Sequence, residues 1–116
     1  ETTMKDLAKF SAALDLFTQI YYKSTVNHAR AFLEIACRVD EIIQTRDLPA
    51  MLGMSQTTVN RTIRAMADRS YIHEQGWGLM KIHTDMEDER QRIVELTPKG
   101  KKLALDMLEI VYGKAK

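Results

Sequence analysis

One short segment, residues 45–69, constrains the fold more than any other part of the chain. Pro49 has no amide hydrogen and is tolerated only in the first turn of a helix, which predicts a short helix over residues 47–52. Gly53 can adopt a positive φ and ends that helix. Ser55 is a typical N-cap and predicts that a second helix begins directly after it. The segment therefore predicts two helices joined by a tight turn.

The second of these helices has one apolar and one polar face. Its inward side chains recur at i, i+4 and i+7 and predict a helix over residues 56–69: Val59, Ile63 and Met66. The polar face suits DNA, because Arg can bond guanine O6 and N7 together and Asn or Gln can pair with adenine. The pair is thus a helix-turn-helix, with these predicted DNA-binding residues: Ser55, Gln56, Thr57, Asn60, Arg61 and Arg64.

The position of a side chain along this helix predicts what it contacts. Residues near the start of the second helix normally reach base edges. Those residues are Gln56, Thr57, Asn60 and Arg61. Arg64 lies further along and is predicted to contact a base or a phosphate. A helix pair with a merely solvated polar face is the alternative.

Two extended segments follow the helix pair. Residues 71–84 and 91–96 alternate apolar and polar side chains around a polar connection, which predicts a β-hairpin with a charged tip. An Arg at such a tip can enter the minor groove, where negative potential is concentrated. Arg90 and Arg92 are therefore predicted to bind DNA. Asp88 is predicted to hold Arg90 or the turn in shape through charge-assisted bonds, and a solvated turn is the alternative.

Helices are also predicted on both sides of this unit, over residues 4–23, over residues 26–43 and from the Thr97-Pro98 cap onward. Two apolar lines run along the first of them: Leu7, Phe10, Leu14, Phe17 and Tyr21 on one face, and Ala13, Leu16 and Ile20 on another. Residues 103–112 are apolar almost all round. One small core can cover only part of this surface, so residues 4–23 and 98–113 are predicted to join two copies as a homodimer. A helix buried on two sides within a monomer is the alternative.

The composition bounds the class of protein. The 116 residues fit one domain, 1–116, and contain 45% apolar and 28% charged residues, as a folded chain does. The net charge is only +1, so DNA binding must depend on local Arg placement. No apolar run reaches the roughly 18–20 residues of a membrane span and no leader is recognised, so we expect a cytoplasmic protein. No phosphate loop, metal cluster or nucleophile–base pair is visible, so we expect no enzyme, cofactor or metal.

Two single residues leave alternatives open. Cys37 is the only cysteine and suits a reducing compartment. It is predicted to be a small buried core residue, with a redox-sensing thiol as the alternative. Trp77 is either a hydrophobic plug under the hairpin or a contact to a ligand or to DNA.

The hairpin region resembles the MarR family of winged-helix regulators. The motif is Asp88-x-Arg90 followed by Ile93-Val94-Glu95-Leu96-Thr97-Pro98-Lys99-Gly100, behind a helix-turn-helix and between flanking helices. The resemblance covers about residues 5–112. It implies a dimer joined through the N- and C-terminal helices, a recognition helix in the major groove and Arg90 in the minor groove. Many members release DNA when a small molecule binds between their dimerisation and DNA-binding parts, so an effector is an expected partner.

Three departures from the family are visible. Gln91 stands where many members have a second Arg, Gly76-Trp77-Gly78 lengthens the wing, and one C-terminal helix replaces the usual two. The expected fold is mainly α with a small β-hairpin wing, and residues 26–97 form its winged helix-turn-helix part. The expected function is that of a sequence-specific, double-stranded DNA-binding transcription regulator, a dimeric repressor. The alternative is a winged-helix module for protein interaction or replication, without operator binding.

Overall fold

The computed structural model describes residues 3–20, 24–67, 77–84, 86–87 and 90–113. In chain order its elements are a 3-10 turn at Met4–Asp6, α1 (Leu7–Ile20), α2 (Val26–Ala36), β1 (Ile43–Gln44), a 3-10 turn at Thr45–Asp47, α3 (Leu48–Leu52), α4 (Gln56–Met66), β2 (Met80–Thr84), β3 (Arg92–Leu96) and α5 (Pro98–Tyr112). None of the helices in these residues is long and apolar enough to cross a membrane.

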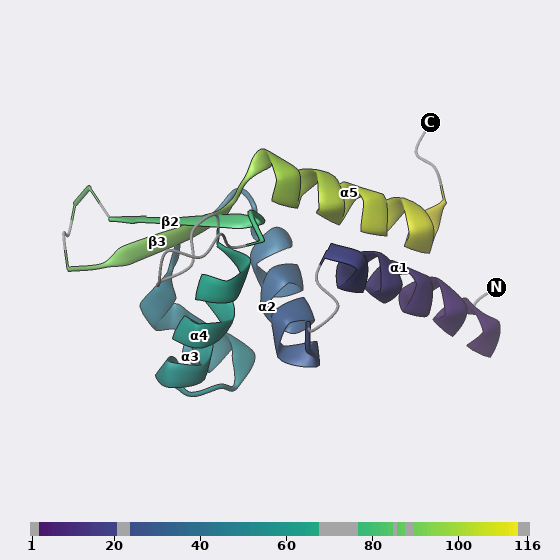
Figure 1. Ribbon diagram of the computed structural model, residues 1–116, viewed down its shortest axis with the longest axis horizontal. Coiled ribbons are helices and arrows are strands. Elements are labelled where there is room, and N and C mark those ends of the chain that lie inside the picture. Colours follow the sequence, from purple (N-terminus) through teal and green to yellow (C-terminus); the bar gives the residue numbers. More distant parts are fainter. Residues whose placement is uncertain (1–2, 21–23, 68–76, 85, 88–89, 114–116) are drawn as a thin grey trace.

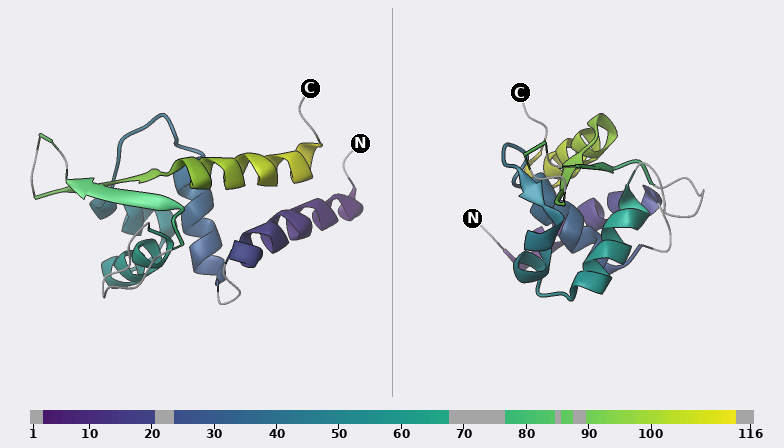
Figure 2. Two further views of the ribbon diagram at one scale, coloured as in Figure 1. Left: turned by 45° about the horizontal axis from the view of Figure 1, so that its top comes forward. Right: turned by 90° about the vertical axis from the view of Figure 1, so that its left-hand side faces the viewer.

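The molecule is elongated, with extents of 48 × 28 × 27 Å. The hairpin of β2 and β3 projects at one end, and α1 and α5 lie side by side and antiparallel at the other (Figure 1). The compact unit of α2, α3 and α4 lies between them, as Figure 2 shows from two further sides. The arrangement separates a projecting hairpin from a pair of terminal helices.

β3 is the central strand of a small antiparallel sheet with the order β1-β3-β2. Val94 faces Ile43 of β1 on one side and Ile82 of β2 on the other. Val94 is buried, so the sheet closes over the core next to α2 and α4. β1 directly precedes the helix-turn-helix, and the sheet therefore ties the hairpin to it.

The helix boundaries that depend on local capping agree with the predictions. Ser55 Oγ accepts a hydrogen bond from the Thr58 amide at 3.1 Å, and Thr97 Oγ1 accepts one from the Gly100 amide at 3.1 Å. Gly53 has a φ of 67° and ends α3, a conformation that costs glycine little. Val59, Ile63 and Met66 are buried as predicted.

The second predicted helix is too long. α2 ends at Ala36, and Ile43 belongs to strand β1 instead of a helix over residues 26–43. Leu33, Val39 and Ile42, three apolar side chains of the segment predicted as that helix, are exposed. Ile43 is buried through its pairing with β3, so the apolar pattern reflects two different elements.

The hairpin is shorter on its first side than predicted. β2 begins at Met80, and the residues before it, 77–79, return alongside the end of α4. The amides of Trp77, Gly78 and Leu79 donate to carbonyls of Ala65, Ala67 and Met66 at 2.9–3.2 Å. Residues 71–76 lie outside the described residues, as does Asp88.

The first of the two apolar lines predicted along the first helix, which contains Phe10 and Phe17, lies partly in the core and partly at the surface. Phe17 is 1% exposed and packs in the core with Ala13, whereas Phe10 is 52% exposed. Leu7 and Leu14 are also exposed, and Tyr21 lies outside the described residues. The core therefore covers one face of α1 and leaves a second apolar face uncovered in the single chain.

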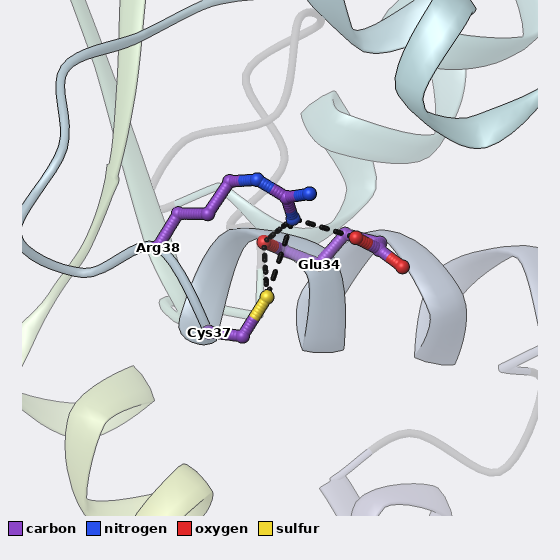
Figure 3. Close-up of polar contacts among 3 residues, drawn as sticks. All are labelled: Glu34, Cys37 and Arg38. Carbon is purple, nitrogen blue, oxygen red and sulfur yellow. Dashed lines mark hydrogen bonds and ion pairs between the residues drawn. The ribbon is translucent and has the colours of Figure 1, made fainter.

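Cys37 is exposed, so the prediction of a buried core residue is wrong. It follows the last residue of α2, where its Sγ donates to the Glu34 carbonyl at 3.2 Å and accepts from Arg38 Nη1 at 3.2 Å (Figure 3). Arg38 also pairs with Glu34 Oε1 at 2.6 Å, and this bond raises the pKa of Arg38. The three residues form a small hydrogen-bonded cluster at the end of α2.

Trp77 is half-buried and packs against the core, as a plug would. Its ring lies edge-on to Phe17 of α1, with centroids 6.2 Å apart, and 4.7 Å from the ring of His28 on α2. The plug therefore joins the segment that leads into the wing to both α1 and α2.

Candidate nucleic-acid interface

The contacts that hold α4 in place determine which of its side chains are exposed. Its apolar side packs in the core through Val59 and Ile63. Arg30 of α2 donates from Nη1 to the Leu52 carbonyl at 2.9 Å, which satisfies a carbonyl at the end of α3. Gly53 then reverses the chain into the Ser55 cap. These local contacts fix α4 with its polar side directed away from the core.

The polar side of α4 carries the side chains that the sequence predicted. Gln56, Thr57, Arg61 and Arg64 are exposed, and Asn60 is half-buried. Gln56 Nε2 donates to Asn60 Oδ1 at 2.9 Å, so these two amides form a pair one helical turn apart. Ser55 differs from the rest, because its hydroxyl serves as the N-cap and also bonds Thr58 Oγ1 at 3.0 Å.

The wing supplies a second surface from one face of its sheet. Near its base that face is apolar and buried through Met80, Val94 and Leu96. Further out the same face carries the opposed pair Thr84 and Arg92, in which Arg92 Nη1 donates to Thr84 Oγ1 at 3.1 Å. Because alternate residues of a strand share one face, the same face of the hairpin belongs to the core near its base and is polar surface further out.

The other face of the wing holds a small charge cluster. Glu95 Oε2 lies 2.9 Å from His83 Nε2, and Glu95 Oε1 lies 3.6 Å from Lys81 Nζ. The hydrogen bond from His83 is the largest cause that lowers the pKa of Glu95, and Lys81 adds to it. The acid therefore pairs with His83 and Lys81 on its own side of the sheet, away from the face that carries Arg92.

A groove of about 620 Å³ separates α4 from the wing and brings the two surfaces together. Five predicted DNA-binding residues line it: Gln56, Asn60, Arg64, Arg90 and Arg92. Thr57 and Arg61 are exposed on α4 but do not line this groove. Residues that are about 30 positions apart in the chain therefore share one concave surface.

Thr45 and Arg46 are among the residues of this groove that the sequence did not predict as DNA-binding residues. They belong to the 3-10 turn before α3, which β1 carries next to the wing. The only sequence feature that could have indicated these two residues is the positive charge of Arg46 just before the helix-turn-helix. With Arg46, four Arg side chains line the groove, and none of its described lining residues is acidic. A chain with a net charge of +1 thus concentrates positive charge at one place, which favours a polyanion.

The Thr97-Pro98-Lys99-Gly100 motif fixes the base of the wing. Thr97 Oγ1 donates to the Gly78 carbonyl at 2.6 Å, and Lys99 Nζ donates to the Trp77 carbonyl at 3.0 Å. Pro98 opens α5 in its first turn. The motif therefore holds the end of β3, the start of α5 and the segment before β2 in one junction.

Solved structures resemble this chain over most of its length. The structure of Staphylococcus aureus MepR in complex with DNA is 18% identical and has a TM-score of 0.69, covering 91% of this chain and 75% of that one. MarR is 18% identical, with a TM-score of 0.62 and coverage of 95% and 71%. The heme sensor PefR of Streptococcus agalactiae, in complex with heme, is 17% identical, with a TM-score of 0.63 and coverage of 90% and 67%.

No protein-family model matches the sequence, and no curated protein does. The likeness is thus one of fold, and it confirms the predicted class, mainly α with a small antiparallel sheet as the wing. The order of the helix-turn-helix, the wing and the flanking helices is the one that the sequence motif implied. This chain has the winged helix-turn-helix fold of the MarR-type regulators.

Proposed function

We propose that this protein is a sequence-specific regulator of transcription, a dimeric repressor of the MarR type that binds double-stranded DNA. The groove between α4 and the wing carries the proposal, because it joins amide side chains that can read bases to four Arg side chains that can contact phosphates. The function is one of binding, in the cytoplasm where the DNA lies, and involves no catalytic step.

In this proposal α4 enters the major groove and the wing follows the neighbouring minor groove. Residues at the start of α4 contact base edges, as recognition helices do. Arg90 lies at the turn before β3 and lines the same groove as α4, so it reaches the minor groove while α4 is in place. The fold likeness to MepR, whose structure is a DNA complex, supports this placement.

The terminal helices supply the dimer in this proposal. On α1 and α5, six large apolar side chains are exposed in the single chain: Leu7, Phe10, Leu14, Leu105, Leu108 and Tyr112. Between these helices and α2 lies an apolar hollow of about 360 Å³, lined by Phe10, Leu33 and Leu108 among others. Monomers rarely expose apolar patches of more than a few hundred Å², so a second copy is the occupant that we propose for this face.

Two copies related by a two-fold axis place two α4 helices on one side of the duplex. Their operator is then a pseudo-palindrome with half-sites about 34–36 Å apart. A small-molecule effector is proposed as well, bound between the terminal helices and the helix-turn-helix. The fold likeness to the heme sensor PefR supports such regulation without indicating the compound.

The direct test is selection of bound sites from random duplexes, followed by gel retardation at several salt concentrations. We expect an enriched palindromic site, a steep fall in affinity with salt and lower expression of a reporter placed behind that site. If no duplex is retarded even at low salt, the proposal is wrong and a protein-interaction module becomes the better interpretation. Higher reporter expression would retain DNA binding but contradict the repressor assignment.

A further inference from the structure

Gln56 and Asn60 are joined by a hydrogen bond between their side chains. The Gln56 Nε2 group donates to Asn60 Oδ1 at 2.9 Å, and both side chains line the groove between α4 and the wing. Residues four positions apart lie next to each other on one helix face, which is why a Gln and an Asn at this spacing can bond. The two amides therefore face the groove as a linked pair.

The bond divides the remaining polar atoms unequally. Gln56 keeps both lone pairs of its Oε1 and one N–H donor, whereas Asn60 keeps two donors and only one of the two lone pairs of its Oδ1. Adenine presents an N6 donor beside an N7 acceptor in the major groove, and an amide matches it with one acceptor and one donor. Gln56 keeps that combination fully available.

We propose that Gln56 reads an adenine of the operator and that Asn60 is a positioning residue, which holds the Gln56 amide in its reading orientation. This rests on the proposed function, because it requires α4 to enter the major groove. Burial agrees with the division of roles, since Gln56 is exposed while Asn60 is half-buried behind it. A free Gln side chain loses considerable rotamer freedom on binding, and the Asn60 bond removes part of that loss in advance.

The test measures base preference at every operator position for the unmodified protein, Gln56→Ala, Asn60→Ala and the double variant. We expect one adenine per half-site to be preferred about 5- to 150-fold over other bases, the range of a good bidentate contact. Both single variants lose most of that preference at the same position, and the double variant loses no more than Gln56→Ala. Asn27→Ala is the matched control, because Asn27 is an amide side chain that is exposed at the start of α2 and does not line the groove.

A conservative variant separates positioning from direct reading. Asn60→Asp keeps an acceptor for Gln56 Nε2 and removes both Asn60 donors, so it retains the adenine preference. Its overall affinity falls because a carboxylate now faces the phosphates, and the preference is therefore measured at low salt. If Asn60 only stabilised the fold, the adenine preference would not depend on whether residue 60 carries a hydrogen-bond acceptor.

Three results would overturn the inference: Asn60→Ala relaxing a different position from Gln56→Ala, Asn60→Asp losing the preference as fully as Asn60→Ala, or a selected base other than adenine at the shared position. Each of these leaves specific binding by the unmodified protein intact. A failure of the proposed function differs, because the unmodified protein then binds no duplex.

Discussion

The α-carbon of Gly100, in the first turn of α5, lies directly against the backbone carbonyl of Leu79. A methyl group at position 100 would overlap that carbonyl oxygen. The same oxygen accepts a hydrogen bond from the Thr97 amide at 3.0 Å. The neighbour of Gly100 is backbone, so rotation of a side chain cannot relieve the overlap.

Gly100→Ala is therefore expected to destabilise the fold, although alanine favours helices. Overpacking of this kind costs about 1–3 kcal/mol of unfolding free energy, and the midpoint of urea unfolding measures it. Lys101→Ala is the control, because Lys101 is exposed one position further along α5. An equal midpoint for Gly100→Ala and the unmodified protein would show that the junction adjusts easily.

Arg90→Ala is expected to weaken operator binding by about 1–3 kcal/mol, the range of a good specific contact. Its thermal unfolding is expected to stay close to that of the unmodified protein, because Arg90 is exposed on the wing. Lys102→Ala removes the same charge from α5, where Lys102 pairs with Asp106 outside the groove. If both variants bind with equal affinity, the wing Arg contributes only bulk charge.

Arg61 and Arg64 are expected to act differently, although both are exposed on α4. Arg64→Ala is expected to weaken all sequences alike and to reduce the salt slope by about 1, as loss of a phosphate contact does. Arg61→Ala is expected to relax preference at particular operator positions. Binding curves over a salt series on the operator and on an unrelated duplex distinguish these effects, and equal, uniform losses would contradict base reading by Arg61.

Phe10→Glu combined with Leu14→Glu is expected to give a folded monomer that binds the operator weakly. Burying each apolar side chain against a partner contributes roughly 1.5–3 kcal/mol, and charges there remove it. Phe17 belongs to the same predicted apolar line but is unsuitable for this test, because it is 1% exposed and its replacement would unfold the core. Sedimentation measures the oligomeric state.

The matched control is Val26→Glu, which introduces a carboxylate in place of an exposed apolar side chain at the start of α2, outside the two helices proposed to form the dimer. It is expected to leave the dimer intact. A stable monomer of the unmodified protein at tens of micromolar, still binding its operator tightly, would contradict the dimer and the role of both helices.

His28 is expected to make stability depend on pH. Burial lowers its pKa below the ordinary 6.5, and its Nδ1 accepts a hydrogen bond from the Thr25 amide at 3.0 Å. The unfolded chain takes up a proton as pH falls through 6.5 while folded His28 stays neutral, so its stabilisation is complete above pH 6.5 and is lost below it.

Urea midpoints between pH 7 and pH 5 measure this effect, with His28→Gln as the variant that cannot titrate. The unmodified protein is expected to lose more stability over that interval than His28→Gln. Glu95, whose pKa is lowered from 4.5, contributes its loss at more acidic pH and does not obscure the comparison. Parallel profiles would show that His28 protonation is not coupled to folding.

The features that the sequence could predict are those determined within a few residues. The Ser55 and Thr97 caps each bond an amide three positions along the chain, and Gly53 ends α3 through its own φ. The polar side of α4 follows from its periodicity in the same way. Gln56 and Asn60 could for this reason be placed on the polar side of α4 from the sequence alone.

Features that depend on distant partners could not be predicted in this way. Ile42 and Ile43 continue the apolar pattern of α2, and only the pairing of Ile43 with Val94 makes a strand of this segment. Phe17 lies close to both apolar lines of α1, and contacts with Phe32 and Trp77 decide that it faces the core. Arg46 reaches the groove only because the sheet carries its turn there.

The pairing of Ile43 with Val94 has a consequence for the order of folding. These residues face each other although about 50 positions separate them in the chain. The whole helix-turn-helix and most of the wing lie inside the loop that this pairing closes. Closing so long a loop loses chain entropy before its contacts stabilise anything, so the sheet assembles after the local helices. A nascent chain whose β3 has not yet been synthesised therefore holds α3 and α4 without Arg92 beside them, and the groove between α4 and the wing is completed only once β3 has formed.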